Sequence, residues 1–182
     1  MDKVNESIIN AGFGGQGVMV LGKFFATAGM LHNFKVTWLP SYGAEVRGGT
    51  AHSYVRISSN PIANPAVFNP DAAVIMNAPS LDKFEDRIKP GGLLILNSSM
   101  ATRQPKRKDI DIVEVPLTDE ATRIGNVKTA NIIAAGIYAA RKKIFKKEIL
   151  QDVIKTMLNA KEELVSVNLD ALERGMEIGK GK

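Results

Sequence analysis

Apolar positions along the chain follow two spacings that alternate in sequence. Short continuous apolar runs are typical of buried strands, and apolar residues three and four positions apart are typical of helices. The runs predict strands at 7–11, 34–39, 51–57, 72–76, 93–97 and 111–115. The helical spacing predicts helices at 16–31, 81–88, 129–142, 146–159 and 161–176, with one more that starts at Thr118.

This alternation of strands and helices predicts the fold class. The continuous apolar runs at 72–76 and 93–97 indicate strands buried on both faces, as in a mostly parallel sheet covered by helices. We therefore expect one α/β domain over residues 1–182, Rossmann-like at its start and helical in its C-terminal part.

Single residues refine these elements. Ser80 is expected to cap the helix at 81–88. The helix at 16–31 is expected to carry an apolar stripe of Val20, Leu21, Phe24, Phe25, Ala28 and Leu31. Strand 51–57 should place Ala51, Ser53, Val55 and Ile57 on one face and His52, Tyr54 and Arg56 on the other. The alanines and glycine of 129–142 permit close helix packing.

Composition narrows the chemistry. The chain has no cysteine and two histidines, so it has no disulfide, no thiolate nucleophile and no cysteine ligand for zinc or an iron–sulfur cluster. We expect no metal site. No apolar run approaches the roughly 18 residues that cross a bilayer, and the N-terminus is polar and charged. A cytoplasmic protein without a membrane contact is expected.

A glycine-rich loop follows the first strand. The sequence GFGGQG at 12–17 places Gly12, Gly14 and Gly17 in the G-x-G-x-x-G pattern, together with Gly15 and Gln16. A strand, a glycine turn and a helix N-terminus form an anion site that suits a phosphate. A dinucleotide site also needs an acid at the end of the second strand, and KVTWLPSYG has none. A dinucleotide site, a site for another phosphate-bearing ligand and a purely structural tight turn therefore all stay open.

A second glycine-rich loop, SYGAEVRGGT at 41–50, combines Tyr42, Glu45, Arg47, Gly48, Gly49 and Thr50. If the sheet is parallel, the first two strands end at one edge, and the two loops lie side by side there. Arg47 is suited to holding a phosphate or carboxylate in a bidentate fork. Glu45 has a structural alternative, an ion pair with Arg47 that holds the loop.

Two basic runs offer a nucleic-acid interpretation. The net charge is +5, and basic residues gather in RQPKRK (103–108) and ARKKIFKK (140–147). Phe145 is the only aromatic residue in either run, whereas binders of single strands stack bases on aromatic side chains. The runs are better interpreted as solvated faces, and no nucleic-acid partner is expected.

The two loops, with GNVKTANIIAAG at 125–136, resemble the gamma subunit, or gamma domain, of the 2-oxoacid:ferredoxin oxidoreductases. The resemblance runs from about residue 7 to 175 and rests on the combination of the loops. In the third segment, Asn126 and Lys128 are candidates for the same ligand edge. The alternative is a simple helix entry capped by Thr129.

The resemblance implies a reaction and partners. Such enzymes decarboxylate a 2-oxoacid to an acyl-CoA and reduce ferredoxin, with thiamine diphosphate, Mg²⁺ and iron–sulfur clusters in the alpha, beta and ferredoxin-like delta subunits. The gamma subunit implied here has no catalytic residue and no firmly bound cofactor of its own. We expect it to help bind coenzyme A through the loop residues named above and to cover the active site.

The substrate and the partner-facing surface are further expectations. Glu-Val-Arg-Gly-Gly stands where pyruvate enzymes more often have Glu-Arg-Arg-Gly-Ala, which favours 2-oxoglutarate or branched-chain oxoacids, and indolepyruvate enzymes share much of the pattern. Loop 58–70 has three prolines and three asparagines, and Ile62, Ala63, Ala66, Val67 and Phe68 are expected to face partners or a second copy in a homodimer. The alternatives are a stand-alone Rossmann-type nucleotide-binding oxidoreductase and a basic nucleic-acid-binding module.

Overall fold

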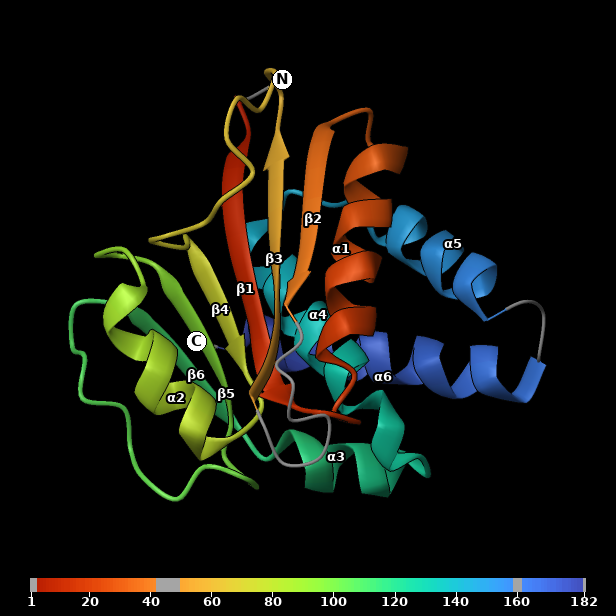
Figure 1. Ribbon diagram of the computed structural model, residues 1–182. Helices are drawn as coiled ribbons and strands as arrows, with labels where there is room; N and C mark the ends of the chain where they lie inside the picture. The colour runs from red at the N-terminus through yellow and green to blue at the C-terminus, as the bar shows by residue number, and fades with distance from the viewer. Residues whose placement is uncertain (1–2, 42–49, 159–161, 182) are drawn as a thin grey trace.

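The computed structural model describes residues 3–41, 50–158 and 162–181 (Figure 1). The strands are β1 (Asn5–Phe13), β2 (Lys35–Ser41), β3 (Thr50–Ser58), β4 (Ala72–Ile75), β5 (Leu93–Asn97) and β6 (Asp111–Val115). The helices are α1 (Val18–Leu31), α2 (Ala78–Phe84), α3 (Leu117–Ile124), α4 (Ala130–Lys142), α5 (Lys147–Met157) and α6 (Glu162–Lys180), with short 3-10 turns at Glu85–Arg87 and Val127–Thr129. The strand and helix pattern of the sequence is thus confirmed, with boundaries shifted by a few residues.

The strands form one mixed sheet in the order β2-β3-β1-β4-β5-β6. β1, β4, β5 and β6 are parallel, whereas β3 is antiparallel to both of its neighbours, β1 and β2. The sheet is mostly parallel, as predicted, but β3 separates the two strands that a Rossmann start would pair directly. Because β3 is reversed, β2 runs in the same direction as β1, and the two strands end at the same edge.

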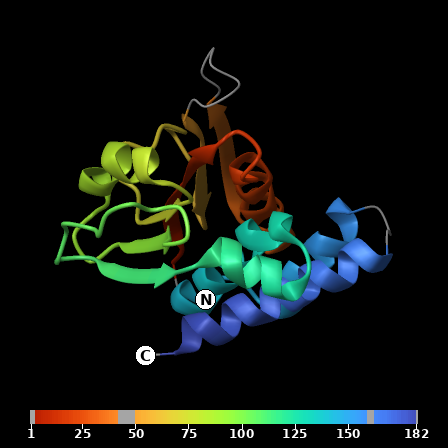
Figure 2. The same cartoon turned by 90° about the horizontal axis from the view of Figure 1, so that it is seen from below.

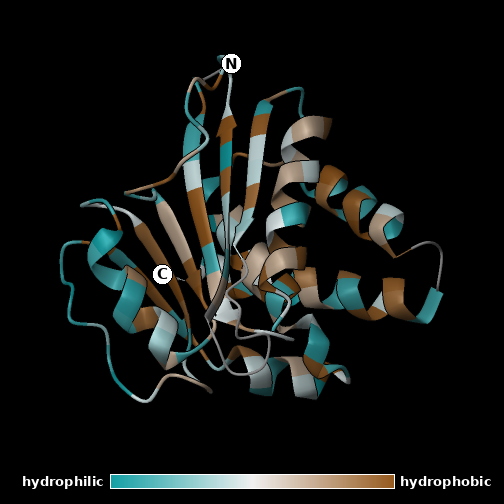
Figure 3. Ribbon diagram, in the orientation of Figure 1, coloured by the Kyte–Doolittle hydropathy of each residue, from teal (hydrophilic) through white to brown (hydrophobic). Residues whose placement is uncertain are grey.

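Helices cover the two faces of the sheet unequally. The larger core joins α1, α3, α4, α5 and α6 to one face, and the smaller core joins α2 to the other. Figure 2 shows α2 and the α4–α6 helices on opposite sides of the strands. Figure 3 shows the central strands coloured as hydrophobic and the outer helices striped. β4 and β5 are fully buried, and their continuous apolar sequences suit strands that are covered on both faces.

The buried side of α1 differs from the predicted stripe. Leu21, Phe24, Phe25 and Ala28 are buried as expected, but Val20 is 48% exposed and Leu31 is 50% exposed. The buried stripe of α1 is narrower than predicted because the helix contacts the sheet through its glycines. Gly22 and Gly29 let α1 lie close against β2 and β3, and Gly22 faces Trp38 and Ser53. Val20 is left on the flank of the helix. In β3 the predicted alternation is confirmed, with Ser53, Val55 and Ile57 buried.

Two helix starts also differ from the predictions. Asn77, rather than Ser80, caps α2, because its Oδ1 accepts the Ser80 N–H at 3.0 Å and Ser80 itself is buried in the first turn. Helix α3 begins at Leu117, after Pro116. The Thr118 hydroxyl is instead an acceptor for Asn97 Nδ2 at 2.9 Å.

Helices α4 and α6 pack backbone to backbone. A Cβ atom on Gly136 would collide with the Leu172 carbonyl, and one on Gly175 with the Ile133 carbonyl. The close packing predicted from the small residues of α4 is therefore confirmed. Within the parts that the structure describes, no helix is both long and apolar enough to span a membrane.

Candidate functional site

The glycine loop connects β1 to α1 at the carboxyl edge of the sheet. Gly15 and Gly17 have φ angles of +97° and +73°, a left-handed conformation that favours glycine. Gly17 is the N-cap of α1, and no side chain caps that helix. The first N–H groups of α1 and the positive end of its dipole therefore face the edge without a side-chain partner.

The side chain of Gln16 secures this loop. Its Oε1 accepts the Phe13 N–H at 2.6 Å and Asn77 Nδ2 at 3.2 Å, and its Nε2 donates to the Met76 carbonyl at 3.1 Å. A Cβ atom at Gly12 would lie 2.6 Å from Gln16 Oε1. Gly12 and Gln16 thus have the structural role that the tight-turn interpretation assigned to the loop.

A hollow of about 480 Å³ lies beside the loop. Gly15 and Gly17 line it together with Asn126 and Lys128, so the structure unites two of the three segments that the sequence singled out. Its remaining wall is largely apolar and is formed mainly by Val20, Phe24, Ile132, Ile154, Leu158 and Leu164. Gly14 is exposed but does not line this hollow.

Two residues without a predicted role belong to the hollow, Lys23 and Asn131. Asn131 is 4% exposed, and its Nδ2 donates to the Gly17 carbonyl at 3.2 Å. Its Oδ1 is buried and has no hydrogen-bond partner. Because an unpartnered buried acceptor costs about 1–3 kcal/mol, Asn131 Oδ1 is suited to accept a hydrogen bond from a donor in the hollow. The signal in the sequence was its position in the segment 125–136.

The helix entry at Asn126 has a structural role as well. Asn126 Oδ1 accepts the Lys128 N–H at 3.0 Å and so caps the 3-10 turn before α4. Thr129 does not cap, because its hydroxyl donates to the Asn126 carbonyl at 2.8 Å. Lys128 is exposed at the rim of the hollow, at the ligand edge that the sequence suggested.

Most of the second glycine-rich loop lies outside the described residues. Tyr42, Glu45, Arg47, Gly48 and Gly49 fall in 42–49. The structure describes the residues on either side of that range. Ser41 ends β2 and pairs with His52, and Thr50 begins β3 and pairs with Phe13, the last residue of β1. The two loops therefore start from the same edge, as predicted.

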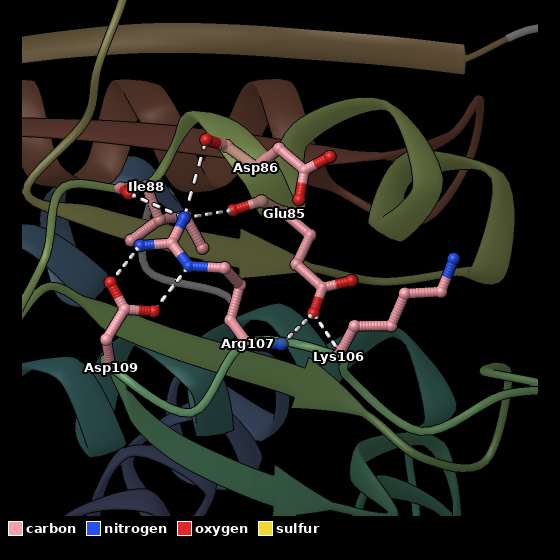
Figure 4. A network of polar contacts seen from close by, with 6 residues as sticks. All are labelled: Glu85, Asp86, Ile88, Lys106, Arg107 and Asp109. Atoms are coloured by element: carbon pink, nitrogen blue, oxygen red, sulfur yellow. Dashed lines mark hydrogen bonds and ion pairs between the residues drawn. The ribbon is translucent and has the colours of Figure 1, made fainter.

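The two arginines of the basic run at 103–108 are paired with nearby acids of the same chain. Arg103 pairs with Asp82 at 2.6 Å and with Glu85 at 2.8 Å, and Arg107 pairs with Asp109 (Figure 4). Glu85 is 2% exposed, and its Oε1 accepts the backbone N–H groups of Lys106 and Arg107. Burial raises the pKa of Glu85, but these hydrogen bonds and Arg103 outweigh it, and the pKa lies below its ordinary value of 4.5.

The second basic run is partly paired in the same way. Arg141 lies 3.5 Å from Asp111, Lys142 lies 2.8 Å from Glu6, and Lys147 pairs with Glu173. Such pairing favours a structural interpretation of both runs over a phosphate-binding band. Among the described residues, no three His, Cys, Asp or Glu side chains gather as metal ligands would.

A glycine turn that opens onto an uncapped helix, at the carboxyl edge of a mostly parallel sheet, puts the chain in a class of α/β domains whose glycine loops are suited to phosphate-bearing ligands. Within that class, residues 7–178 match the family model described as pyruvate ferredoxin/flavodoxin oxidoreductase, and the chain belongs to this family. The family resemblance noted from the two loops is thereby confirmed.

Relatives and solved structures agree with this assignment. The chain is 35% identical over 168 residues to a ketoisovalerate oxidoreductase subunit VorA of Methanothermobacter thermautotrophicus, covering 92% of this chain and 35% of the relative. It is 32% identical over 181 residues to a 2-oxoglutarate synthase subunit KorC of Methanocaldococcus jannaschii, covering 98% and 96%. The chain thus spans about a third of the VorA relatives and nearly all of KorC.

Among structures, the gamma subunit of a keto/oxoacid ferredoxin oxidoreductase from Geobacter sulfurreducens superposes with a TM-score of 0.82, at 27% identity over 96% of this chain and 98% of that one. A 2-oxoglutarate:ferredoxin oxidoreductase from Magnetococcus marinus, bound to 2-oxoglutarate, coenzyme A and succinyl-CoA, superposes with a TM-score of 0.89 at 24% identity. All of this chain matches 32% of that one, and the likeness concerns the fold alone.

Proposed function

We propose that this chain is the gamma subunit, or gamma part, of a 2-oxoacid:ferredoxin oxidoreductase, where it helps to bind coenzyme A and covers the active site. The assembled enzyme would convert a 2-oxoacid to an acyl-CoA and reduce ferredoxin. Iron–sulfur clusters would be held by partner subunits, since this chain has no cysteine. Thiamine diphosphate and Mg²⁺ would also lie in partner subunits, as the family resemblance implies. The family match and the similar length of KorC support this role.

The hollow beside the glycine loop carries the coenzyme A proposal. Coenzyme A is anionic at its phosphates and largely apolar along its pantetheine arm. The open N-terminus of α1 and the cations Lys23 and Lys128 suit the phosphates, and no Asp or Glu is among the described residues that line the hollow. The aliphatic wall suits the rest of the molecule. Arg47, which the sequence predicts as a phosphate ligand, would add a bidentate phosphate contact.

The same lining favours a binding role over a catalytic one. Apart from its two lysines, asparagines and Thr129, the described lining is glycine or apolar side chains, and Asn126 is already engaged as a cap. General acid–base chemistry requires a titratable group within reach of the reacting atoms. The reacting centre is therefore assigned to the partner subunits.

For the oxoacid we propose 2-oxoglutarate, with ketoisovalerate as the competing substrate. The Glu-Val-Arg-Gly-Gly sequence and the relation to KorC support the first, and the relation to VorA supports the second. Affinity purification of the chain from its host under strict anaerobiosis, followed by viologen reduction with coenzyme A, tests this directly. Activity with one acid among 2-oxoglutarate, pyruvate, 2-oxoisovalerate and indolepyruvate identifies the substrate. A chain that elutes alone from an active lysate contradicts the subunit role.

The coenzyme site is tested by variants in the assembled enzyme. Lys128→Ala and Arg47→Ala should raise the KM for coenzyme A several-fold and leave the KM for the oxoacid unchanged, because only the coenzyme carries phosphates. Lys106→Ala is the matched control, since Lys106 is an exposed lysine in the basic run at 103–108 and does not line the hollow. Equal coenzyme KM values in all three variants would show that the site is misplaced.

A further inference from the structure

Away from the glycine loop, the loop between β3 and β4 exposes an aromatic side chain. Phe68 is 71% exposed and, with Leu39 and Tyr54, lines a hollow of about 540 Å³. Leu39, on the edge strand β2, is 39% exposed. The predicted partner-facing set is narrower than the sequence suggested, because Val67 is buried and Ile62 and Ala66 are half-buried. We call the group Leu39, Tyr54, Phe68 and Arg87 the Phe68 surface.

Two arginines fix the backbone that carries Phe68. Arg87 donates from Nε to the Phe68 carbonyl at 2.9 Å, from Nη2 to the Val67 carbonyl at 2.8 Å and from Nη1 to the Tyr54 hydroxyl at 3.2 Å. Arg56 Nη1 donates to the carbonyls of Asn64 and Ala66 at 2.9 and 3.4 Å. The exposed ring therefore projects from a loop that hydrogen bonds hold on both sides, as a rigid interface anchor does.

The charge at this surface is uncompensated. The hydrogen bonds of Arg56 and Arg87 go to carbonyl and hydroxyl oxygens, and neither arginine forms a salt bridge with a carboxylate of the described residues. In the basic run, by contrast, Arg103 and Arg107 both pair with acids. The Phe68 surface thus combines an apolar centre with the single half-buried cation of Arg87, with Arg56 behind the loop, which is complementary to an apolar pocket with an acidic group at its rim.

The sheet beneath the surface lacks its second helical layer. Among the described helices, only α1 packs extensively against β2, and it does so from the opposite face, through Val36 and Trp38. No described residue of β2 is fully buried. Sheets of this class are normally covered on both faces, so this half of the face is open to a partner.

We propose that the Phe68 surface docks the larger part of the oxidoreductase, through an acid-rimmed pocket that receives the Phe68 ring. The matched region makes up 35% of each VorA relative and 32% of the Magnetococcus marinus chain, so in those proteins this fold is joined to a body about twice its size. The inference rests on the proposed subunit function, and it assigns the surface by which that body is held.

The test measures assembly with the purified remaining subunits. Phe68→Asp should weaken co-purification at least about tenfold, as loss of a central aromatic anchor does, and Leu39→Ser should weaken it less. Phe68→Leu should retain most of the binding. Met100→Asp is the matched control, because Met100 is 42% exposed on a different loop. Thermal unfolding of each isolated variant checks that the fold is kept. We expect Phe68→Asp to fold, because the Phe68 side chain is exposed.

The outcomes separate the two proposals. If the wild-type chain does not associate with the other subunits, the proposed function is wrong. If the wild type assembles and Phe68→Asp assembles equally well, the subunit role stands and the docking surface is wrong. Loss of self-association without loss of subunit binding would also overturn the proposal, since the occupant would then be a second copy of this chain.

Discussion

The loops that follow β1 and β5 leave the same edge of the sheet and differ in how completely their polar groups are satisfied. The loop after β5 carries the four basic residues of 103–108. Its two arginines are paired with acids, and Glu85 accepts the backbone N–H groups of Lys106 and Arg107. The glycine loop carries no charge between positions 12 and 17, yet it opens onto an uncapped helix and the unpartnered Asn131 oxygen. The proposed ligand site therefore lies beside the loop with unfilled hydrogen-bonding capacity and not beside the more highly charged loop.

Removal of Glu85 should have the largest effect, because it breaks the satisfied loop. Glu85→Ala leaves two backbone N–H groups without their acceptor and removes one of the two carboxylates that pair with Arg103, and loss of one partner in a buried ion pair costs about 3–5 kcal/mol. Urea unfolding of the isolated chain measures the change. Asp152→Ala, at an exposed ion pair, should cost under about 0.5 kcal/mol. A Glu85→Ala chain as stable as this control would show that the basic loop is held by other contacts.

Gly17→Ala should have the second largest effect and disturb the open loop. An L-residue at φ +73° is strained by about 1–2 kcal/mol, and its Cβ would press on the Asn131 amide. Gly15→Ala is the control, because it carries similar backbone strain at φ +97° but its Cβ would meet nothing within 4 Å. The difference between the two unfolding free energies isolates the Asn131 contact. Equal losses would mean that Asn131 moves aside freely.

Asn131→Ala should separate ligand binding from stability. The variant loses the bond to the Gly17 carbonyl but also removes an orphaned acceptor, so the unfolding free energy should change by less than about 1 kcal/mol. In the assembled enzyme, the KM for coenzyme A should rise about fivefold, the equivalent of one hydrogen bond. A loss of stability near that of Glu85→Ala, with an unchanged KM, would make Asn131 a packing residue only.

Local signals in the sequence predicted the strands and most helices. The runs at 72–76 and 93–97 had to be strands buried on both faces, and the alternation of 51–57 fixed its faces. That alternation has no direction, however, so the reversal of β3 between β1 and β2 was not predictable from it. Asn77 was missed as a cap because Ser80, three residues later, is also a capping residue.

The candidate site was predictable only in part, because it is assembled from distant segments. The glycine pattern identified Gly15 and Gly17, which line the hollow. It could not show that the Gln16 side-chain amide is hydrogen-bonded to Asn77 and Met76 instead. The predicted apolar stripe included Val20, which instead remains exposed at the hollow because the helix lies close to the sheet through its glycines. The wall contributed by α5 and α6 depends on packing that no local signal reports.

Lowering the pH should change the stability of the loop after β5 but not that of the glycine loop. This is the smallest of the predicted effects. The folded pKa of Glu85 lies below 4.5, so the unfolded chain binds more protons, and the stability from its charge is present above pH 4.5 and lost as pH falls below it. Glu85→Gln keeps an acceptor oxygen, and near pH 7 it should be less stable than wild type by under about 1 kcal/mol. This gap should close on acidification, as urea midpoints measured from pH 7 to 3 would show. The gap between wild type and Gly17→Ala should stay constant over that range, because no titratable side chain lies within the glycine loop. A Glu85→Gln gap that stays constant from pH 7 to 3 would mean that the carboxylate charge does not hold the basic loop.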